Sequence, residues 1–227
     1  HAAGLQAADA LLDWLKAHLA RQRAAGGTVW LVHHIPWGID AYASNHARGA
    51  SCAARIVPLL REPHASALYA LLAEYRDTVR ASFSGHTHFD DYRLLFDGQG
   101  RVAGLDKITP ALSPIYGQKP GFQLFDYDRA DGTPTDLETW HLVNPGAPAA
   151  LAEWRREYRF SEAYGRAYGV GSVAALWRSM AGGGAARETY RRLYRLGNGG
   201  IAEADFPAHL CSVGNVDVAG FAACWCR

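Results

Sequence analysis

The first 32 residues contain two kinds of apolar pattern. From residue 5 to residue 25, leucines and alanines recur every three or four positions, and the run ends at Gly26-Gly27. This spacing predicts an amphipathic helix that ends at a glycine cap. Residues 28–32 (TVWLV) then form a continuous apolar run. Such a run is typical of a strand that is buried on both faces.

A second helix and a second strand follow along the chain. Residues 65–77 carry leucines and tyrosines at helical spacing, and residues 79–83 (VRASF) are typical of another strand. In between, residues 36–64 hold three prolines and little periodicity, which predicts a long irregular connection with one short helical stretch. The order helix, strand, helix, strand predicts an α/β fold.

Beyond residue 91 the pattern changes to short apolar segments separated by turns that contain glycine. These segments predict a mostly antiparallel sheet. After the Pro- and Gly-rich stretch 144–148, aromatic residues recur at helical spacing, so we expect only helices there. We therefore expect a boundary near residue 146, with one part over residues 1–146 and a helical subdomain over residues 147–227. The expected strands cover residues 92–96, 102–108, 122–127 and 137–142.

Composition and charge exclude several classes of protein. Of 227 residues, 49% are hydrophobic and 20% are charged, which excludes disordered, collagen-like and coiled-coil chains. Lysine and arginine number 23 against 22 acidic residues, so the net charge is +1 and no stable nucleic-acid binding is expected. No apolar run in the sequence is long enough to cross a membrane, and residues 1–25 do not resemble a signal peptide.

The two apolar strands each run directly into histidine. The first is followed by His33-His34, and the second by the motif GHTH, which contains His86 and His88. If the strands are parallel neighbours, both groups lie at the carboxyl edge of one sheet, where α/β proteins bind ligands. In an extended segment, residues two apart point the same way, so His86 and His88 are expected to face a common centre.

Imidazole is a good ligand for zinc and other transition metals. We therefore predict that His34, His86 and His88 are metal ligands, and that His33 points away from them. Asp90 and Asp91 follow directly, and three roles stay open for them: metal ligands, acceptors that orient an imidazole, or turn residues before the next strand.

Other catalytic motifs are absent from the sequence. It contains no phosphate-binding P-loop, no glycine-rich dinucleotide motif behind a strand and no nucleophile elbow. No residue is therefore assigned as a nucleophile or as a general acid.

The cysteines cluster unevenly. Cys211, Cys224 and Cys226 lie close to the C-terminus, while Cys52 stands apart. Spacing alone leaves two interpretations open, a local disulfide near the C-terminus or four free thiols in a reducing compartment. A zinc site there would need a fourth ligand such as His209, and is the weaker alternative.

Three segments resemble the calcineurin-like metallophosphoesterases, and within them the acid sphingomyelinase-like phosphodiesterases. Residues 29–38 (VWLVHHIPWG) are similar to the family's strand that ends in GHIPPG, and residues 83–91 (FSGHTHFDD) are similar to its GHTH block. Residues 154–169 (WRREYRFSEAYGRAYG), which precede the terminal cysteines, are similar to the family's tail. The order of the three segments adds to the specificity of the resemblance.

The resemblance implies the C-terminal portion of a metallophosphoesterase β-sandwich flanked by helices, followed by a small α-helical subdomain. It implies two divalent metal ions, usually zinc, with His34, His86 and His88 among the ligands. The implied activity is hydrolysis of a phosphodiester, of either the phospholipid or the nucleotide type, with peripheral lipid contact as a further expectation. It also favours a disulfide between Cys211 and Cys224, with Cys52 and Cys226 left as thiols or as a longer bridge.

The chain departs from the family pattern in several places. The DxH, GD and GNH blocks that supply further metal ligands are absent, His33 replaces a glycine, and Trp37 stands where a second proline is common. We therefore expect the C-terminal part of a longer, exported enzyme, secreted or periplasmic, that is inactive without the N-terminal half of the same domain. That half is expected to cover an exposed apolar sheet edge.

Two alternatives remain open at this point. The first is a non-catalytic remnant or interaction module that lacks a complete dinuclear site, and the absent blocks favour it. The second is an unrelated mononuclear metal hydrolase, for which Asp90 or Asp40 would have to act beside the histidines.

Overall fold

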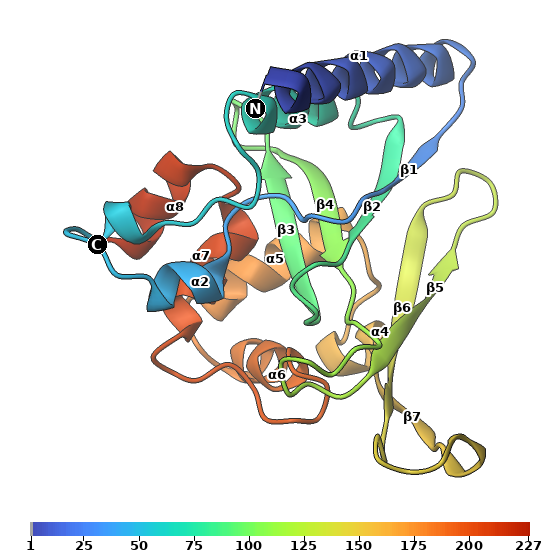
Figure 1. The fold of residues 1–227 in the computed structure, drawn as a ribbon. Coiled ribbons are helices and arrows are strands. Elements are labelled where there is room, and N and C mark those ends of the chain that lie inside the picture. Colours follow the sequence, from blue (N-terminus) through green and yellow to red (C-terminus); the bar gives the residue numbers. More distant parts are fainter. Residues whose placement is uncertain (1) are drawn as a thin grey trace.

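The computed structural model describes residues 2–227 (Figure 1). Strands and helices are mixed up to residue 159, and the regular elements after it are helices. The strands are β1 (Val29–Val32), β2 (Val79–Ser84), β3 (Asp91–Phe96), β4 (Val102–Ile108), β5 (Gly121–Tyr127), β6 (Pro134–Leu142) and β7 (Trp154–Arg159). The α-helices are α1 (Ala2–Ala24), α2 (Ala41–His46), α3 (His64–Glu74), α4 (Phe160–Tyr164), α5 (Val170–Met180), α6 (Ala185–Leu193), α7 (Phe206–Gly214) and α8 (Val218–Trp225).

The first sheet has the strand order β1-β2-β4-β3. β1 and β2 are parallel, with Val32 opposite Phe83, and β2 and β4 are also parallel. β3 lies at the other edge and is antiparallel to β4. The parallel β1–β2 pair confirms the neighbours expected from the helix and strand order. It brings the histidines that follow the two strands to the same edge of the sheet.

The second sheet is antiparallel and has the strand order β5-β6-β7. β7 corrects the sequence prediction, which placed only helices beyond residue 146. Trp154 and Tyr158 are four positions apart, which suits a helix, but β7 pairs with β6 and Tyr158 lies opposite Thr139. Pairing with β6 buries Tyr158 in the core and decides the conformation. The expected mostly antiparallel sheet is thus divided between two sheets.

Apolar side chains pack against both faces of the first sheet. On one face, α1 and α3 lie side by side over the sheet (Figure 1). Leu15 and Leu19 of α1 pack there with Leu71 of α3 and with side chains of the neighbouring strands. On the other face, Leu94 and Leu105 contribute to a cluster that also contains side chains of the second sheet and of α4 to α7. The first sheet therefore lies between a layer of helices and a layer made of the second sheet and the C-terminal helices. This confirms an α/β fold with a helical C-terminal part.

Two disulfides hold the C-terminal helices. Cys211 in α7 is bonded to Cys224 in α8, which is the pair that the family resemblance implied. Cys52 is bonded to Cys226, so the irregular segment between β1 and α3 is tied to the end of the chain. The cysteines that the sequence left undecided are therefore all paired.

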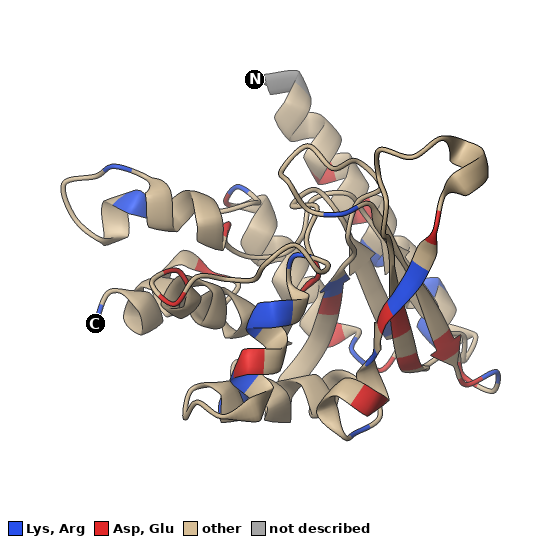
Figure 2. Cartoon of the chain, turned by 90° about the horizontal axis from the view of Figure 1, so that it is seen from below, with Lys and Arg blue, Asp and Glu red and all other residues tan. Residues whose placement is uncertain are grey.

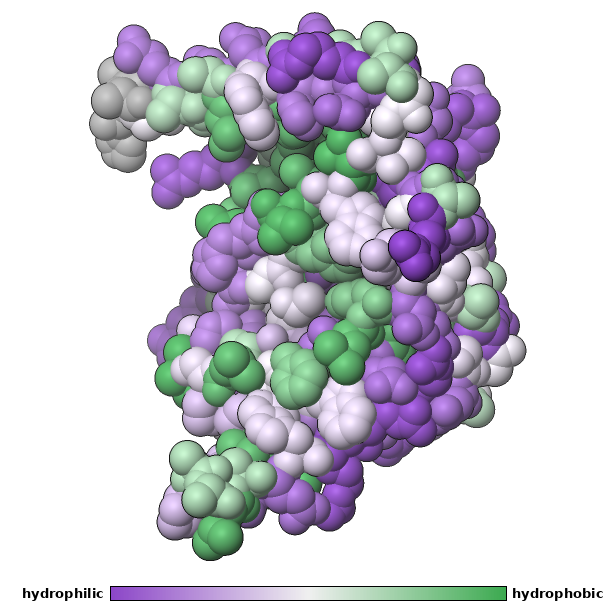
Figure 3. Space-filling view, turned by 90° about the vertical axis from the view of Figure 1, so that its right-hand side faces the viewer, coloured by the Kyte–Doolittle hydropathy of each residue, from purple (hydrophilic) through white to green (hydrophobic). Residues whose placement is uncertain are grey.

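The surface has mixed charge and one apolar edge. Figure 2 shows basic and acidic residues interspersed along the ribbon, in keeping with the net charge of +1. No helix within residues 2–227 combines the length and the apolar character that a membrane crossing requires. β1 is an edge strand, and its Val32 is 75% exposed. On the face that carries the β5–β6 hairpin, apolar side chains gather towards the middle (Figure 3).

Candidate functional site

The carboxyl ends of β1 and β2 bring two histidines together. The backbone N–H of Gly85 donates to the carbonyl oxygen of His34 at 3.0 Å, which continues the pairing of the two strands past their ends. The rings of His34 and His86 lie 5.2 Å apart between centroids and are nearly perpendicular. Both side chains are exposed, and neither ring hydrogen-bonds to another residue of the described chain. Two unengaged imidazoles therefore face the same edge of the sheet.

His88 lies apart from this pair. The sequence prediction assumed an extended GHTH segment, but His86 and His88 have φ angles of 63° and 70°, which lie in the left-handed region. The backbone therefore turns between them, and the rings do not point the same way as in a strand. The His88 ring lies 5.0 Å from the Tyr116 ring, and the amide of Gln118 lies 3.5 Å from Nδ1 of His88. Left-handed backbone at non-glycine residues often marks a functional site.

The histidines at the carboxyl edge of the first sheet provide some of the ligands that a metal ion needs. Imidazole nitrogens suit zinc, and His34 and His86 are exposed and close together. Within residues 2–227, however, no three His, Cys, Asp or Glu side chains are arranged to hold a metal ion. The described residues thus offer some of the ligands of a metal site, and the assignment of His34, His86 and His88 stays a prediction.

The His33 side chain points into the protein, away from His34, and its hydrogen bonds hold the end of β1 in place. Its Nδ1 lies 2.8 Å from the carbonyl oxygen of Ile35, and its Nε2 lies 2.8 Å from Oγ of Ser82 and 3.3 Å from the buried carboxylate of Asp106. Burial alone would lower the pKa of His33, but the hydrogen bond and the charge of Asp106 outweigh it and raise the pKa. These contacts fix the backbone from which the His34 side chain projects.

Asp90 and Asp91 lie at the start of β3, which is one of the three roles that the sequence left open, and neither hydrogen-bonds to an imidazole within residues 2–227. Asp90 is buried and accepts from the ammonium of Lys107 at 2.5 Å, and Asp91 is buried and accepts from Arg93 at 2.6 Å. Burial opposes the charge of Asp91, but the Arg93 guanidinium holds the pKa of this carboxyl below its ordinary value. Both acids therefore neutralise buried cations. A mononuclear site built on Asp90 has no support in this geometry.

A separate pair of titratable groups lies within the second sheet, on β6 and β7. Nδ1 of His141 lies 3.2 Å from a carboxylate oxygen of Glu157, and both side chains are at least 90% buried. Burial raises the pKa of Glu157 to about 7 and lowers that of His141. The sequence carried no signal of this pair, because the two residues meet only through the pairing of β6 with β7.

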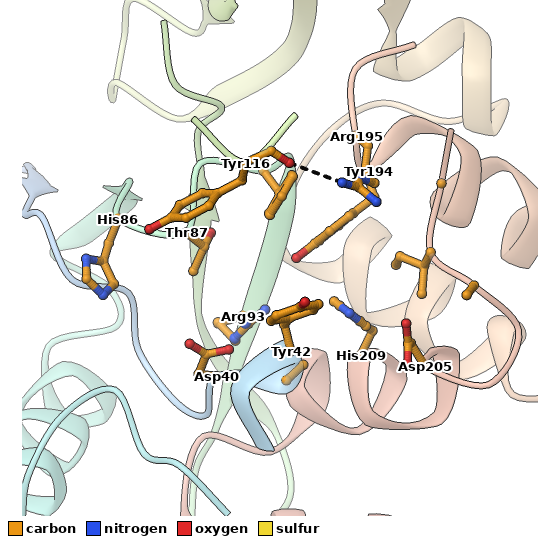
Figure 4. Close-up of a pocket in the computed structure, with 15 residues that line it drawn as sticks. Asp40, Tyr42, His86, Thr87, Arg93, Tyr116, Tyr194, Arg195, Asp205 and His209 are labelled. Carbon is orange, nitrogen blue, oxygen red and sulfur yellow. Dashed lines mark hydrogen bonds between the residues drawn. The ribbon is translucent and has the colours of Figure 1, made fainter. Parts of the chain in front are cut away.

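A cavity of about 420 Å³ opens beside His86 (Figure 4). The GHTH segment, β3 and the connection between β4 and β5 line one part of it, and α2, α7 and the loop between α6 and α7 line the rest. No motif in the sequence indicates this cavity, because the residues that line it lie far apart in the chain. Besides His86 and three tyrosines, its polar lining residues are Asp40, Thr87, Arg93, Arg195, Asp205 and His209.

Comparison with known proteins supports the resemblance stated above, although no protein-family model matches the chain. It is 26% identical over 228 residues to the acid sphingomyelinase-like phosphodiesterase 3b of Homo sapiens, a match that covers 93% of this chain and 47% of that protein. It is 27% identical over 159 residues to the cyclic GMP-AMP phosphodiesterase of Bos taurus, covering 67% of this chain and 33% of that protein. The sphingomyelin phosphodiesterase of Homo sapiens is 25% identical over 164 residues, with 68% and 22% covered.

The chain thus spans between about a fifth and a half of the length of these relatives. The matches come from more than one type of phosphodiesterase, and they cover two thirds or more of the present chain. The HIP and GHTH motifs, on which the resemblance rests, lie at adjacent strand ends in the structure. On these grounds the chain is similar to the acid sphingomyelinase-like phosphodiesterases over two thirds or more of its length.

Proposed function

We propose that this chain is part of a metal-dependent phosphodiester hydrolase in which His34, His86 and His88 bind metal. The observation that carries the proposal is the convergence of His34 and His86 at the carboxyl edge of the first sheet, where ligands bind in α/β proteins. The homology to phosphodiesterases supports the type of bond that is cleaved.

In this proposal some residues of the chain bind metal and others position the metal ligands. His34 and His86 supply exposed imidazoles from neighbouring strands, and His88 supplies a third from the other side of the turn. The contact of His33 with Ser82 and Asp106 limits the motion of the β1 end. Two bound divalent ions, zinc in this proposal, would polarise the phosphodiester and activate water for attack on phosphorus.

The remaining metal ligands come, in this proposal, from a preceding half of the same domain. The coverage of the relatives supports a longer protein, because the best-covered one extends to about twice the length of the match. The exposed β1 edge supports a place for it, since an edge strand with an apolar, exposed Val32 needs a partner in a stable sandwich.

Location and lipid contact follow from separate observations. Two disulfides favour an oxidising compartment, so the protein is secreted or periplasmic in this proposal.

The connection between β4 and β5 exposes Leu112, Ile115 and Tyr116, with exposed fractions between 54% and 66%, and the Tyr116 ring lies 5.0 Å from the His88 ring. Exposed apolar side chains beside a site support peripheral contact with lipid.

The metal assignment is tested by substituting each histidine in the full-length protein that contains this chain. We expect His34→Ala, His86→Ala and His88→Ala each to lower bound zinc, and to lower hydrolysis of bis(p-nitrophenyl) phosphate by about 100-fold or more. Zinc is measured by mass spectrometry of the purified protein. His18→Ala is the matched control, because His18 is a histidine on α1, outside the motifs. Unchanged zinc and turnover in the His86 variant would overturn the assignment.

The alternative is a non-catalytic interaction module with an incomplete site. The separation of His88 from the other two rings favours it, as does the lack of a three-residue metal cluster within residues 2–227. A full-length protein that binds zinc through these histidines and cleaves no phosphodiester would support this alternative.

A further inference from the structure

A buried carboxylate lies between the ends of β1 and β2. Asp106 is in β4, opposite Ser82 of the parallel strand β2, and its side chain is fully buried. One oxygen, Oδ1, accepts from the hydroxyl of Ser82 at 2.9 Å and lies 3.3 Å from Nε2 of His33. The other, Oδ2, accepts from the hydroxyl of Ser84 at 2.7 Å and from the backbone N–H of Trp37 at 3.3 Å. Within residues 2–227 no lysine or arginine forms an ion pair with Asp106.

The partners of Asp106 come from the two segments that carry His34 and His86. The histidine and the tryptophan flank His34, and the two serines end β2, with Ser84 two positions before His86. The carboxylate therefore contacts both segments at once. The rings of His34 and His86 lie 5.2 Å apart between centroids. A shift of either segment against the other would break a hydrogen bond to Asp106, so this residue limits how far the two rings can separate.

Two of these partners are positions at which the chain departs from the family pattern. His33 replaces a glycine, and Trp37 stands where a second proline is common. Glycine has no side chain and proline has no backbone N–H, so neither could make the contact observed here. The rings of His33 and Trp37 also stack, with 6.2 Å between centroids and 6° between planes. Both departures therefore add a contact to the same carboxylate, that of Asp106.

A purely structural role accounts less well for this carboxylate. A buried carboxylate without a lysine or an arginine is costly, and an apolar side chain of similar size often stabilises a core as well or better. Leu105 and Ile108 of the same strand are apolar and buried. In addition, every partner of Asp106 lies within four positions of His34 or His86. The carboxylate is thus placed where it acts on the two histidines.

We propose that Asp106 is a positioning residue, whose buried carboxylate fixes the spacing of His34 and His86 by bonding to both segments that carry them. The contacts that this chain adds at His33 and Trp37 make the position of His34 depend on Asp106. This inference rests on the proposed function for the group that the two imidazoles bind, a metal ion. The spacing of the rings in the metal-free protein does not depend on that function, so it can be tested separately.

The first test measures the zinc affinity of the full-length protein by competition with a chromophoric chelator. Asp106→Asn keeps the shape of the side chain but removes its charge and turns one acceptor into a donor, which then faces other donors. We expect zinc to bind about 10- to 100-fold more weakly to this variant. Asp136→Asn is the matched control, because Asp136 is also buried and accepts from a serine and from backbone N–H groups, but it lies in β6. Unchanged zinc affinity in the Asp106 variant, or an equal loss in the control, would overturn the proposal.

Two milder variants keep the test decisive if Asp106→Asn fails to fold. Ser82→Ala and Ser84→Ala each remove one hydroxyl that donates to Asp106. We expect each to weaken zinc binding about three- to tenfold. Ser161→Ala is the control, because its hydroxyl donates to Asp136 in the second sheet. Circular dichroism checks that each variant is folded. Full zinc affinity in both folded β2 variants would contradict the positioning role.

The ring spacing itself is measured in the metal-free protein by NMR with isotope-labelled histidine. Rings whose centroids are 5.2 Å apart give a nuclear Overhauser cross-peak between their protons, and we expect Asp106→Asn to weaken or remove this cross-peak. This measurement separates the two proposals. If the unmodified protein binds no zinc, the proposed function fails, and loss of the cross-peak in the Asp106 variant still supports the positioning role. If the unmodified protein binds zinc and hydrolyses phosphodiesters, an unchanged cross-peak and zinc affinity in the variant reject the positioning role alone.

Discussion

Charged side chains in the core of this protein are held in matched pairs. Lys107 lies 2.5 Å from Asp90, and Arg93 lies 2.6 Å from Asp91, with all four side chains almost fully buried. Burial lowers the pKa of Lys107, and the charge of Asp90 opposes that effect. Removing one member of such a pair leaves an uncompensated buried charge, which costs about 3–5 kcal/mol of stability. The pairs therefore specify how the strand ends pack against the helices.

Glu157 is a buried acid that forms no ion pair with Lys or Arg of the described chain. Burial outweighs the charges of Arg192 and Lys119, so its pKa of about 7 in the folded state lies above that of the unfolded chain. The folded state therefore favours the protonated carboxyl. Its contribution to stability is complete at acid pH and is lost as the pH rises through about 7. We predict that Glu157→Gln, which resembles the protonated acid, raises the free energy of unfolding by about 1–3 kcal/mol at pH 8 and by much less at pH 5. Urea unfolding at the two pH values measures this difference.

The control for this prediction is Glu153→Gln. Glu153 is exposed and its partner Arg155 is also exposed, so little effect is expected at either pH. A gain in the Glu157 variant that is equal at pH 5 and pH 8 would show that the titration of this carboxyl does not limit stability.

At the scale of elements, packing overrides local preference in several places. Trp154 and Tyr158 have helical spacing but lie in β7, because pairing with β6 buries Tyr158. Gly214 ends α7 although alanine favours helices, and here the indole ring of Trp177 occupies the space of a side chain. Trp177 is held in place by its N–H, which donates to the carbonyl oxygen of Leu210 at 2.8 Å. Contacts between elements thus decide both positions.

We predict that Gly214→Ala destabilises the protein by about 1–3 kcal/mol, because the new Cβ would overlap the ring of Trp177. Gly171→Ala, in the first turn of α5, is the matched comparison. No atom lies within 4 Å of its Cβ position, so helix propensity alone predicts a gain of up to about 1 kcal/mol. Thermal unfolding of the two variants tests the difference. A gain in both would mean that Trp177 moves aside without cost.

At the scale of the whole molecule, the disulfides join parts that the sheet does not connect. The Cys52–Cys226 bond joins positions 174 residues apart, whereas the Cys211–Cys224 bond spans 13 residues within the C-terminal helices. In the chain-entropy model, a longer loop restricts the unfolded chain more strongly. The bond between the segment after β1 and the C-terminus therefore contributes to global stability, and the local bond to the pairing of α7 with α8.

We predict that removing the long-range disulfide with Cys52→Ser and Cys226→Ser lowers the free energy of unfolding by about 4–5 kcal/mol. Removing the local one with Cys211→Ser and Cys224→Ser is expected to cost about 3 kcal/mol. Denaturant unfolding of both double variants under oxidising conditions measures the order of the two losses. A larger loss for the local bond would indicate that packing between α7 and α8 matters more than chain entropy.

The sequence by itself determined the helix before β1, the parallel pair of strands and the placing of His34 and His86 at one sheet edge. These features depend on local periodicity and on the order of elements, and both can be read directly from the amino-acid sequence. The tertiary structure alone decided β7, the turn that separates His88 from His86, the burial of Asp90 and Asp91, and the cavity lined by Arg93 and His209. Each of these features depends on contacts between residues far apart in the sequence, and the local pattern of residues does not predict how strong those contacts are.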